Sequence, residues 1–305
     1  MNITILYGGT SAEHKISIQT GLAIAAAIKD RYNLDMIILN AEIYNTPHLL
    51  LDTDLVFNAL HGGDGENGSI QSFMDLHHIP YTGSGAKASK IAMDKNITKL
   101  LAKSVGIPTP NWVLLKKNIH TGIRLEDNQS PKFSYPYVLK PANEGSTFGL
   151  SIVREESELD DAISLAAEFG DEILIEEFIP GKELTVSILG NKPLPIIEII
   201  PNHKLYDYDC KYTEGMSEYV VPADLSDSIE RSLSEDALKI YKTIGCHHYA
   251  RADFRLNDEG QHYLLEINTL PGMTSTSLLP KAAKAAGLEF SDLIDTIIKI
   301  ASLNN

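Results

Sequence analysis

Four polar side chains lie on two strand-like segments late in the sequence. Glu266 and Asn268 follow an apolar run in "LLEIN", and Arg251 and Asp253 are two residues apart in "ARADF". Because side chains alternate across a strand, each pair should point to one side of its strand. Carboxylate and amide oxygens suit Mg²⁺ or Mn²⁺ and do not suit zinc. Since Mg²⁺ usually combines a few carboxylates with substrate phosphates, the cluster predicts a phosphate-bearing ligand, most simply a nucleotide.

The two segments predict a β-hairpin that turns near residues 257–260. A two-residue turn at Glu259-Gly260 would set Asp253 opposite Glu266 and gather the four polar side chains on one side. A bulged turn with Gly260 in the left-handed conformation would shift the register by one residue and separate them. The carboxylates favour the first register, because like charges placed opposite each other need a shared cation. A buried Arg–Asp–Glu structural network is the main alternative.

The sequence holds no P-loop and no Rossmann glycine fingerprint, so phosphates would be held in another way. Lys140 ends an apolar strand, and the glycine-bearing loop 144–149 follows it. Backbone N–H groups of such a loop, with a lysine beneath, can hold polyphosphate. Local sequence around Lys95 favours an ordinary lysine in the first turn of a helix. The segment "EEFIPGKELTV" could bind a purine through its backbone and a ribose through Glu183, or it could be a surface connection.

Composition limits the possible partners of this 305-residue chain. Its formal net charge of -15 makes nucleic acid and anionic membranes poor partners. Cys210 and Cys246 lie in no metal–thiolate spacing and suit a reducing compartment. The N-terminus does not resemble a signal peptide, and no apolar run reaches the length of a membrane span. We therefore expect a cytoplasmic protein.

Strands alternate with helices in the first ninety residues, which predicts an α/β layer with a parallel sheet. Small residues at 79–89 suggest the edge of this first unit. The rest of the chain mixes strands, helices and a polar stretch at 202–219. The domains expected are an α/β unit over 1–92, a central unit over 93–178 and a C-terminal unit over 179–305.

Nine motifs in order give the chain a specific resemblance. They are "GGTSAEH", "ALHGGDGENGSIQ", "PYTGSG", "MDK", "LKPANEGSTFG", "EEFIPGKELTV", "YDYDCKY", "RADF" and "LLEINTLPGMTSTSL". Together they resemble the D-alanine–D-alanine ligases of the ATP-grasp superfamily over nearly the whole chain. The resemblance implies a Rossmann-like N-terminal sheet and two further domains that sandwich ATP. It also implies a homodimer that joins two D-alanines through an acyl phosphate, releasing ADP and phosphate, for peptidoglycan synthesis.

The resemblance assigns the nucleotide and metal residues. Lys95 and Lys140 would bind phosphate, and Glu183 would bind the ribose. Two Mg²⁺ or Mn²⁺ ions would lie on Asp253, Glu266 and Asn268. The residues that would line the adenine site are Glu176, Glu177, Phe178 and Ile179.

For the first substrate, the resemblance implies that Glu13 binds the ammonium group and that His61 lies nearby. Spacing alone favours a different role for Glu13, because "TSAE" matches a Thr-x-x-Glu capping box; both roles can hold. Arg251 and the backbone N–H of Gly272 would stabilise the developing oxyanion.

For the second substrate, Lys211 and Ser277 would bind the carboxylate, with Leu278 close by. Ser146 and Tyr212 would hydrogen-bond toward Glu13 and latch a mobile loop over the site. Thr147-Phe148 is a departure, because relatives often have smaller residues at that place.

Two other functions remain open. One is a D-alanine–D-lactate ligase; Tyr212 argues against it, since relatives that make the ester often carry Phe there. The other is a nucleotide-binding protein without catalysis, which the intact set of polar residues argues against.

Overall fold

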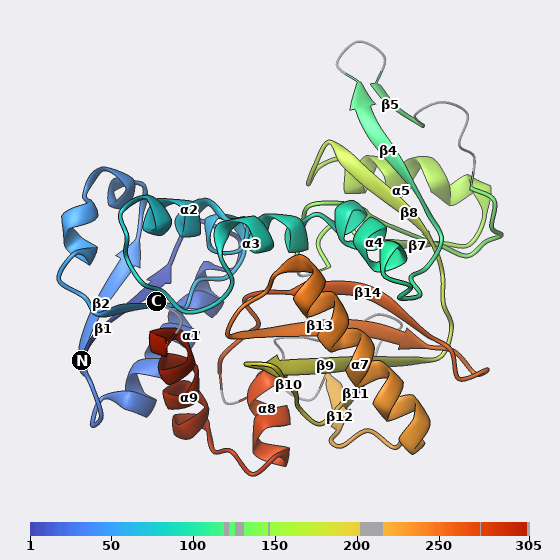
Figure 1. Ribbon diagram of the computed structural model, residues 1–305. Helices are drawn as coiled ribbons and strands as arrows, with labels where there is room; N and C mark the ends of the chain where they lie inside the picture. The colour runs from blue at the N-terminus through green and yellow to red at the C-terminus, as the bar shows by residue number, and fades with distance from the viewer. Residues whose placement is uncertain (119–121, 126–130, 146, 202–215, 275, 304–305) are drawn as a thin grey trace.

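The computed structural model describes residues 1–118, 122–125, 131–145, 147–201, 216–274 and 276–303. Within these residues, three sheets carry the fold (Figure 1), and each has its own apolar core. No helix in these ranges combines the length and the apolar character that a membrane crossing requires. The expected α/β architecture with a parallel N-terminal sheet is confirmed, and the other two sheets in these ranges are antiparallel.

The first sheet is parallel, with strand order β2-β1-β3. The central strand β1 is apolar and buried along most of its length, and α1 packs on it. The last helix, α9, returns to this sheet and completes the same core, beside α1 in Figure 1. The elements here are β1 (Asn2–Gly8), α1 (His14–Ile28), β2 (Asn33–Leu39), η1 (Ala41–Asn45), η2 (Pro47–Leu50), β3 (Leu55–Asn58), η3 (Gly63–Gly65), α2 (Ser69–Leu76), α3 (Ala86–Met93) and α9 (Phe290–Leu303).

The second sheet is antiparallel, with order β5-β4-β8-β6-β7, and α5 covers its apolar face. Helix α4 precedes it and begins where the Asp94 side chain accepts a hydrogen bond from the N–H of Ile97, the bond expected of an N-cap. The elements are α4 (Lys95–Ser104), β4 (Trp112–Asn118), β5 (Gly122–Leu125), β6 (Tyr137–Pro141), β7 (Ser151–Val153), η4 (Glu156–Glu158), α5 (Leu159–Ala166) and β8 (Glu172–Glu177).

The third sheet is also antiparallel, with order β12-β11-β9-β13-β14, and β10 pairs with β9. Helices α4 and α7 bury one face of it (Figure 1). Gly245 ends α7 in the left-handed conformation that glycine adopts readily. The elements are β9 (Lys182–Leu189), β10 (Lys192–Pro193), β11 (Ile197–Pro201), β12 (Ser217–Val220), α7 (Asp227–Ile244), β13 (Tyr249–Leu256), β14 (His262–Asn268) and α8 (Leu278–Ala285).

The hairpin of β13 and β14 keeps the predicted register by an unpredicted route. Of the two turns that the sequence left open, the two-residue turn does not form: Gly260 adopts the left-handed conformation of the other, with a φ of 79°, and Asn257 bonds both to Gly260 and to Gln261 across a longer turn. That turn alone would shift the register by one residue. A β-bulge between Asp253 and Phe254 on the pairing path restores it, so Asp253 still lies opposite Glu266.

Candidate active site

Two adjoining cavities contain most of the residues predicted to do chemistry. The first lies where the second and third sheets meet, and the second lies on the side of the parallel sheet. Lys95, Gly145 and Glu266 line both cavities, so the two are continuous at these residues. The first cavity is also lined by Lys140, Glu144, Thr147, Phe148, Glu176, Glu177, Phe178, Ile179, Glu183, Asp253 and Arg255.

One carboxylate of the pair, Glu266, lines both cavities, and the other, Asp253, lines the first. Asp253 is directly opposite Glu266, and Arg251 is directly opposite Asn268. The guanidinium of Arg251 donates to both oxygens of Asp253, at 2.9 and 2.8 Å. The Thr185 hydroxyl, from the neighbouring strand β9, donates to the same carboxylate at 2.6 Å. The four polar residues therefore share one side of the hairpin, as the favoured register requires.

The donor set fits a hard divalent cation that also binds phosphate. Two carboxylates and one amide oxygen are too few for an all-protein cage and suit an ion whose other ligands are phosphates and water. Within the described ranges, no group of three His, Cys, Asp or Glu side chains is arranged to hold a metal. The Asn268 amide oxygen accepts from the N–H of Leu270 at 2.8 Å, which fixes the side chain at the end of β14.

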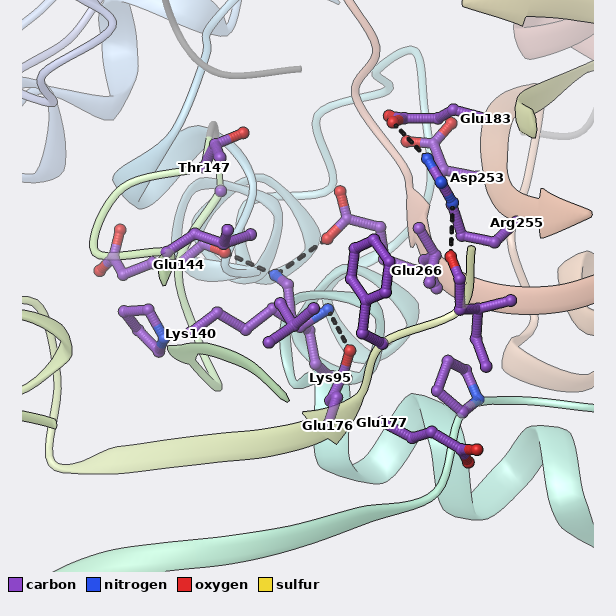
Figure 2. Close-up of a pocket in the computed structure, with 18 of the residues that line it drawn as sticks. Lys95, Lys140, Glu144, Thr147, Glu176, Glu177, Glu183, Asp253, Arg255 and Glu266 are labelled. Carbon is purple, nitrogen blue, oxygen red and sulfur yellow. Dashed lines mark hydrogen bonds and ion pairs between the residues drawn. The ribbon is translucent and has the colours of Figure 1, made fainter. Parts of the chain in front are cut away.

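The two lysines predicted to bind phosphate point into the first cavity (Figure 2). Lys95 Nζ donates to the carbonyl of Glu144 at 2.5 Å and lies 3.1 Å from the Glu266 carboxylate. Lys140 Nζ lies 2.8 Å from the carboxylate of Glu176. Lys95 begins α4, as its local sequence suggests, but it is buried and not an exposed first-turn lysine. Both ammonium groups are therefore held beside the glycine-bearing loop.

A third lysine lies beneath the cavity and was missed by sequence reasoning. Lys99, one helical turn after Lys95, lies 3.0 Å from Glu176 and donates to the Thr109 hydroxyl at 2.8 Å. Burial lowers the pKa of Lys99 to about 8, although Glu176 opposes the shift. Burial acts to raise the pKa of Glu176, but Lys140 and Lys99 outweigh it, so this pKa is lowered. The i, i+4 spacing of the two lysines on α4 was the available signal.

The predicted adenine segment forms one wall of the first cavity. Glu176, Glu177, Phe178 and Ile179 all line it, and Glu183 follows at the start of β9. The Asn111 amide donates to Glu177 at 2.7 Å. Desolvation raises the pKa of Glu144 on the opposite wall, although Lys95 opposes this. The cavity thus has Phe178 and Ile179 on one wall and the ammonium groups of Lys95 and Lys140 beside the loop, an arrangement that suits a purine base and a phosphate chain.

The second cavity contains the residues predicted for the first substrate. Glu13, His61, Arg251 and Gly272 line it, together with Glu66 and Asn268. Glu13 is only 6% exposed. The capping box predicted for it is wrong: α1 begins at His14, which places Glu13 at the N-cap, and its side chain makes no capping hydrogen bond. The carboxylate is directed instead toward Gly62, where an added Cβ would lie 2.9 Å from its Oε2.

His61 is held by two residues that the sequence did not indicate. Its Nε2 lies 2.9 Å from the Thr20 hydroxyl, and its Nδ1 lies 3.8 Å from the Glu66 carboxylate. Both ring nitrogens therefore face polar partners in a buried site. Thr20 is 41 residues away in sequence, so only the folded parallel sheet reveals the contact.

The residues predicted for the second substrate are partly described. Ser277 precedes α8, and its hydroxyl accepts from the N–H of Thr274 at 3.1 Å. An added Cβ on Gly272 would lie 2.8 Å from the same hydroxyl, so a larger residue there would displace the Ser277 side chain. Leu278 is buried against Ile197 and Ala282 in a small core. Ser146, Lys211 and Tyr212 lie outside the described residues.

Comparisons with known proteins agree along the whole chain. The family model described as "D-ala D-ala ligase C-terminus" matches residues 101–299, and the one described as "D-ala D-ala ligase N-terminus" matches residues 40–84. The D-alanine–D-alanine ligase of Syntrophotalea carbinolica is 43% identical over 99% of this chain and 96% of its own. That of Aquifex aeolicus is 42% identical over 98% of this chain and 100% of its own.

A solved structure has the same arrangement. The crystal structure of the D-alanine–D-alanine ligase from Bacillus anthracis complexed with ATP superposes with a TM-score of 0.88 at 36% identity. The match covers 100% of this chain and 98% of that one.

Proposed function

Because the chain belongs to the D-alanine–D-alanine ligase family, and is therefore an ATP-dependent ligase that joins two D-alanines for peptidoglycan synthesis, we propose which of its residues carry each step. One observation supports the proposal above the others: Asp253 in the first cavity is the cross-strand partner of Glu266, which lines both cavities. A nucleotide in the first cavity and an amino acid in the second would meet at this pair.

For the nucleotide, Lys95 and Lys140 bind the phosphates and the segment from Glu176 to Ile179 binds adenine. Glu183 binds the ribose hydroxyls. In the structure both ammonium groups are already paired with carboxylates inside the cavity. Incoming phosphate therefore replaces one charged partner by another, which avoids leaving a buried ammonium unpaired.

Asp253, Glu266 and Asn268 would hold divalent ions, Mg²⁺ or Mn²⁺, as the chemistry of their oxygens favours, and the resemblance implies two such ions. When bound, such ions supply neutralisation of phosphate charge. Arg251 and Lys95 now neutralise the two carboxylates. The side chains of Arg251 and Lys95 are thereby held next to the position where the γ-phosphate would lie.

Glu13 binds the ammonium group of the first D-alanine, and His61 lies beside it. A carboxylate oxygen of this D-alanine attacks the γ-phosphorus, the bond to ADP breaks, and an acyl phosphate forms. Arg251 and the N–H of Gly272 then stabilise the oxyanion as the second amine attacks the acyl carbon. The carbon–oxygen bond to phosphate breaks, and the proton lost by the amine leaves with the phosphate as hydrogen phosphate. Losing one such donor costs roughly 10²–10³ in rate.

The second D-alanine binds through its carboxylate to Ser277 and Lys211, near Leu278. Ser146 and Tyr212 latch a loop that excludes water from the acyl phosphate. Lys211, Ser146 and Tyr212 enter from the resemblance alone. Tyr212 favours the dipeptide over the D-alanyl–D-lactate ester.

The assembly and organisation are also proposals. We infer a homodimer, tested by light scattering of the purified chain, and a cytoplasmic location, where ATP is supplied. The three units remain 1–92, 93–178 and 179–305. Limited proteolysis, which cuts exposed linkers first, tests these boundaries.

The test of function is phosphate release by the full chain with ATP, Mg²⁺ and D-alanine. We expect release that requires D-alanine, ignores L-alanine, and falls to background in Glu266→Gln. Mass spectrometry of the product with D-alanine or D-lactate as acceptor identifies the bond formed. ATP turnover that is indifferent to D-alanine contradicts the proposal.

A further inference from the structure

Arg255 is a cation in the nucleotide cavity to which neither the sequence nor the proposed steps give a role. It follows Asp253 by two residues on β13 and points to the same side of the strand. Its guanidinium makes three contacts with the hinge, residues 179–183: Nε donates to the carbonyl of Ile179 at 3.1 Å, Nη2 donates to the carbonyl of Gly181 at 2.7 Å, and Nη1 donates to Glu183 Oε2 at 3.3 Å. Figure 2 shows the contact between Arg255 and Glu183. The side chains of Arg255 and Glu183 are only 21% and 19% exposed.

These contacts need an arginine and not merely a positive charge. Three acceptors on different residues surround one planar group, and a guanidinium presents five donors in a fixed plane. A lysine at position 255 would place one nitrogen where three now donate. Its three donors share that one nitrogen, so it could not reach both hinge carbonyls and Glu183 as the guanidinium does.

The backbone of the hinge closes on the same strand. Gly181 has a φ of 111°, and a Cβ there would lie 2.1 Å from the carbonyl oxygen of Leu256. No side chain fits at that distance, so the hinge lies directly against the end of β13. Glu183 and Arg255 are also cross-strand partners in the sheet. Residues 179–183 are therefore fixed to the strand that carries Asp253.

The cations that line the cavity lie in two different places. Among the described residues that line it, the cations are Lys95, Lys140 and Arg255. The two lysines pair with Glu266 and Glu176 near the loop, whereas Arg255 contacts the hinge. Arg255 is thus placed to hold one oxygen of Glu183 and so to set the direction of its carboxylate.

We infer that Arg255 is a positioning residue that orients the Glu183 carboxylate toward the ribose hydroxyls and so makes the enzyme distinguish ATP from deoxyadenosine triphosphates. The inference rests on the proposed ribose role of Glu183. It extends that role by naming what fixes the carboxylate and which substrate difference this governs.

The test compares ATP, 2′-deoxyATP and 3′-deoxyATP as substrates of the full chain in the phosphate-release assay. Arg255→Met keeps the aliphatic stem and removes the donors. We expect KM for ATP to rise about tenfold with kcat changed less than about threefold, since charged hydrogen bonds to the hinge are lost. We also expect the preference for ATP over the deoxynucleotides, measured as the ratio of kcat/KM values, to fall about tenfold. Arg231→Met, on the exposed face of α7, is the matched control and should change neither quantity.

A merely structural arginine would reduce the use of all three nucleotides equally and leave their ratio unchanged. Two further variants make the test sharper. Arg255→Lys keeps the charge and should lose the preference as Arg255→Met does. In Glu183→Ala, adding Arg255→Met should cause no further loss of preference, because the two residues act as one unit. If Arg255→Met is poorly folded, calorimetric binding of the three nucleotides to Arg255→Lys decides the question.

Three results overturn the inference: a wild-type enzyme that uses the three nucleotides equally, an unchanged preference in the folded Arg255 variants, or additive losses in the double variant. None of these resembles failure of the proposed function itself. That failure is the absence of D-alanine-dependent phosphate release in the wild-type chain.

Discussion

The ammonium of Lys99 lies 3.0 Å from the carboxylate of Glu176, and the two side chains are 0% and 2% exposed. Lys140 lies on the other oxygen of the same carboxylate. The three residues come from α4, β8 and β6, so one buried charge cluster joins three elements beneath the nucleotide cavity. Burying such a cluster costs desolvation free energy. Removing only one member lowers the stability further, because the remaining partner is left as a poorly compensated buried charge.

Replacing Lys99 by methionine should therefore destabilise the chain by about 3 kcal/mol, the lower end of the range for breaking a buried ion pair, because Lys140 still compensates Glu176. Urea unfolding followed by the fluorescence of Trp112 measures the change. Trp112 is the single tryptophan of the chain and lies on the strand next to Glu176. Lys103→Met removes an exposed lysine that also lies over Trp112, at 4.3 Å from the ring, and should cost less than about 1 kcal/mol. Equal effects in the two variants would contradict a buried role for Lys99.

Stability at acidic pH should depend on His248. Burial lowers the pKa of His248 to about 4, and the neighbouring His247 acts in the same direction. Between pH 6.5 and 4 the unfolded chain binds a proton that the folded chain does not, so the free energy of unfolding falls as pH falls through this window. Above pH 6.5 His248 is neutral in both states, so the loss of folding free energy due to this residue is absent there.

His248→Asn should reduce this loss, since asparagine cannot titrate and tolerates the φ of 62° found at this position. Denaturant unfolding at pH 7, 5.5 and 4.5 measures the slope for each protein. His78→Asn is the matched control, because His78 also has a positive φ but is exposed. A variant slope equal to that of the wild type would show that His248 does not titrate across this window.

Much of the site could be read from the residues, because its parts are local. Glu266 and Asn268 are two residues apart on one strand, so their side chains share a face, and the order of the motifs identifies the family. What could not be read depends on long-range geometry. The turn at Gly260 was left open by its residues, and only the bulge beside Asp253 combines a left-handed Gly260 with the favoured pairing.

The supporting residues were missed for the same reason. Thr185, Arg255 and Lys99 are ordinary members of a strand or helix in the sequence. Their roles come from neighbours 68, 76 and 77 residues away: Asp253, Ile179 and Glu176. No local period signals such contacts. The capping box at Glu13 failed in the opposite way, since a valid local pattern lost to a buried tertiary site.

Thr185 should tune the metal site through Asp253. Its hydroxyl donates to this carboxylate at 2.6 Å in a fully buried position. Thr185→Val keeps the shape but removes the donor, and loss of such a partner typically costs 10–100-fold in metal affinity or activity. We expect the Mg²⁺ concentration for half-maximal phosphate release to rise by about that factor at saturating ATP and D-alanine. Thr185→Ser keeps the hydroxyl and should stay near the wild type; a valine variant with unchanged Mg²⁺ dependence would rule the role out.

The glycine-bearing loop that follows β6 should be restrained by a pair of aromatic rings. Phe148, which lines the nucleotide cavity, stacks on Phe169 beyond the end of α5, with ring centroids 5.9 Å apart and planes inclined by 20°. Such a pair is worth about 0.5–1.5 kcal/mol beyond its buried area. Phe148→Val should therefore open the loop more often, and proteolytic cleavage within 143–149 of the nucleotide-free enzyme should become about 2- to 10-fold faster. Saturating ATP should protect wild type and variant alike.

Phe169→Leu should accelerate cleavage by a similar factor, and the double variant should cleave no faster than either single one, because both changes remove one shared contact. Multiplicative effects of the two substitutions would mean that the rings act independently and do not restrain the loop as a pair.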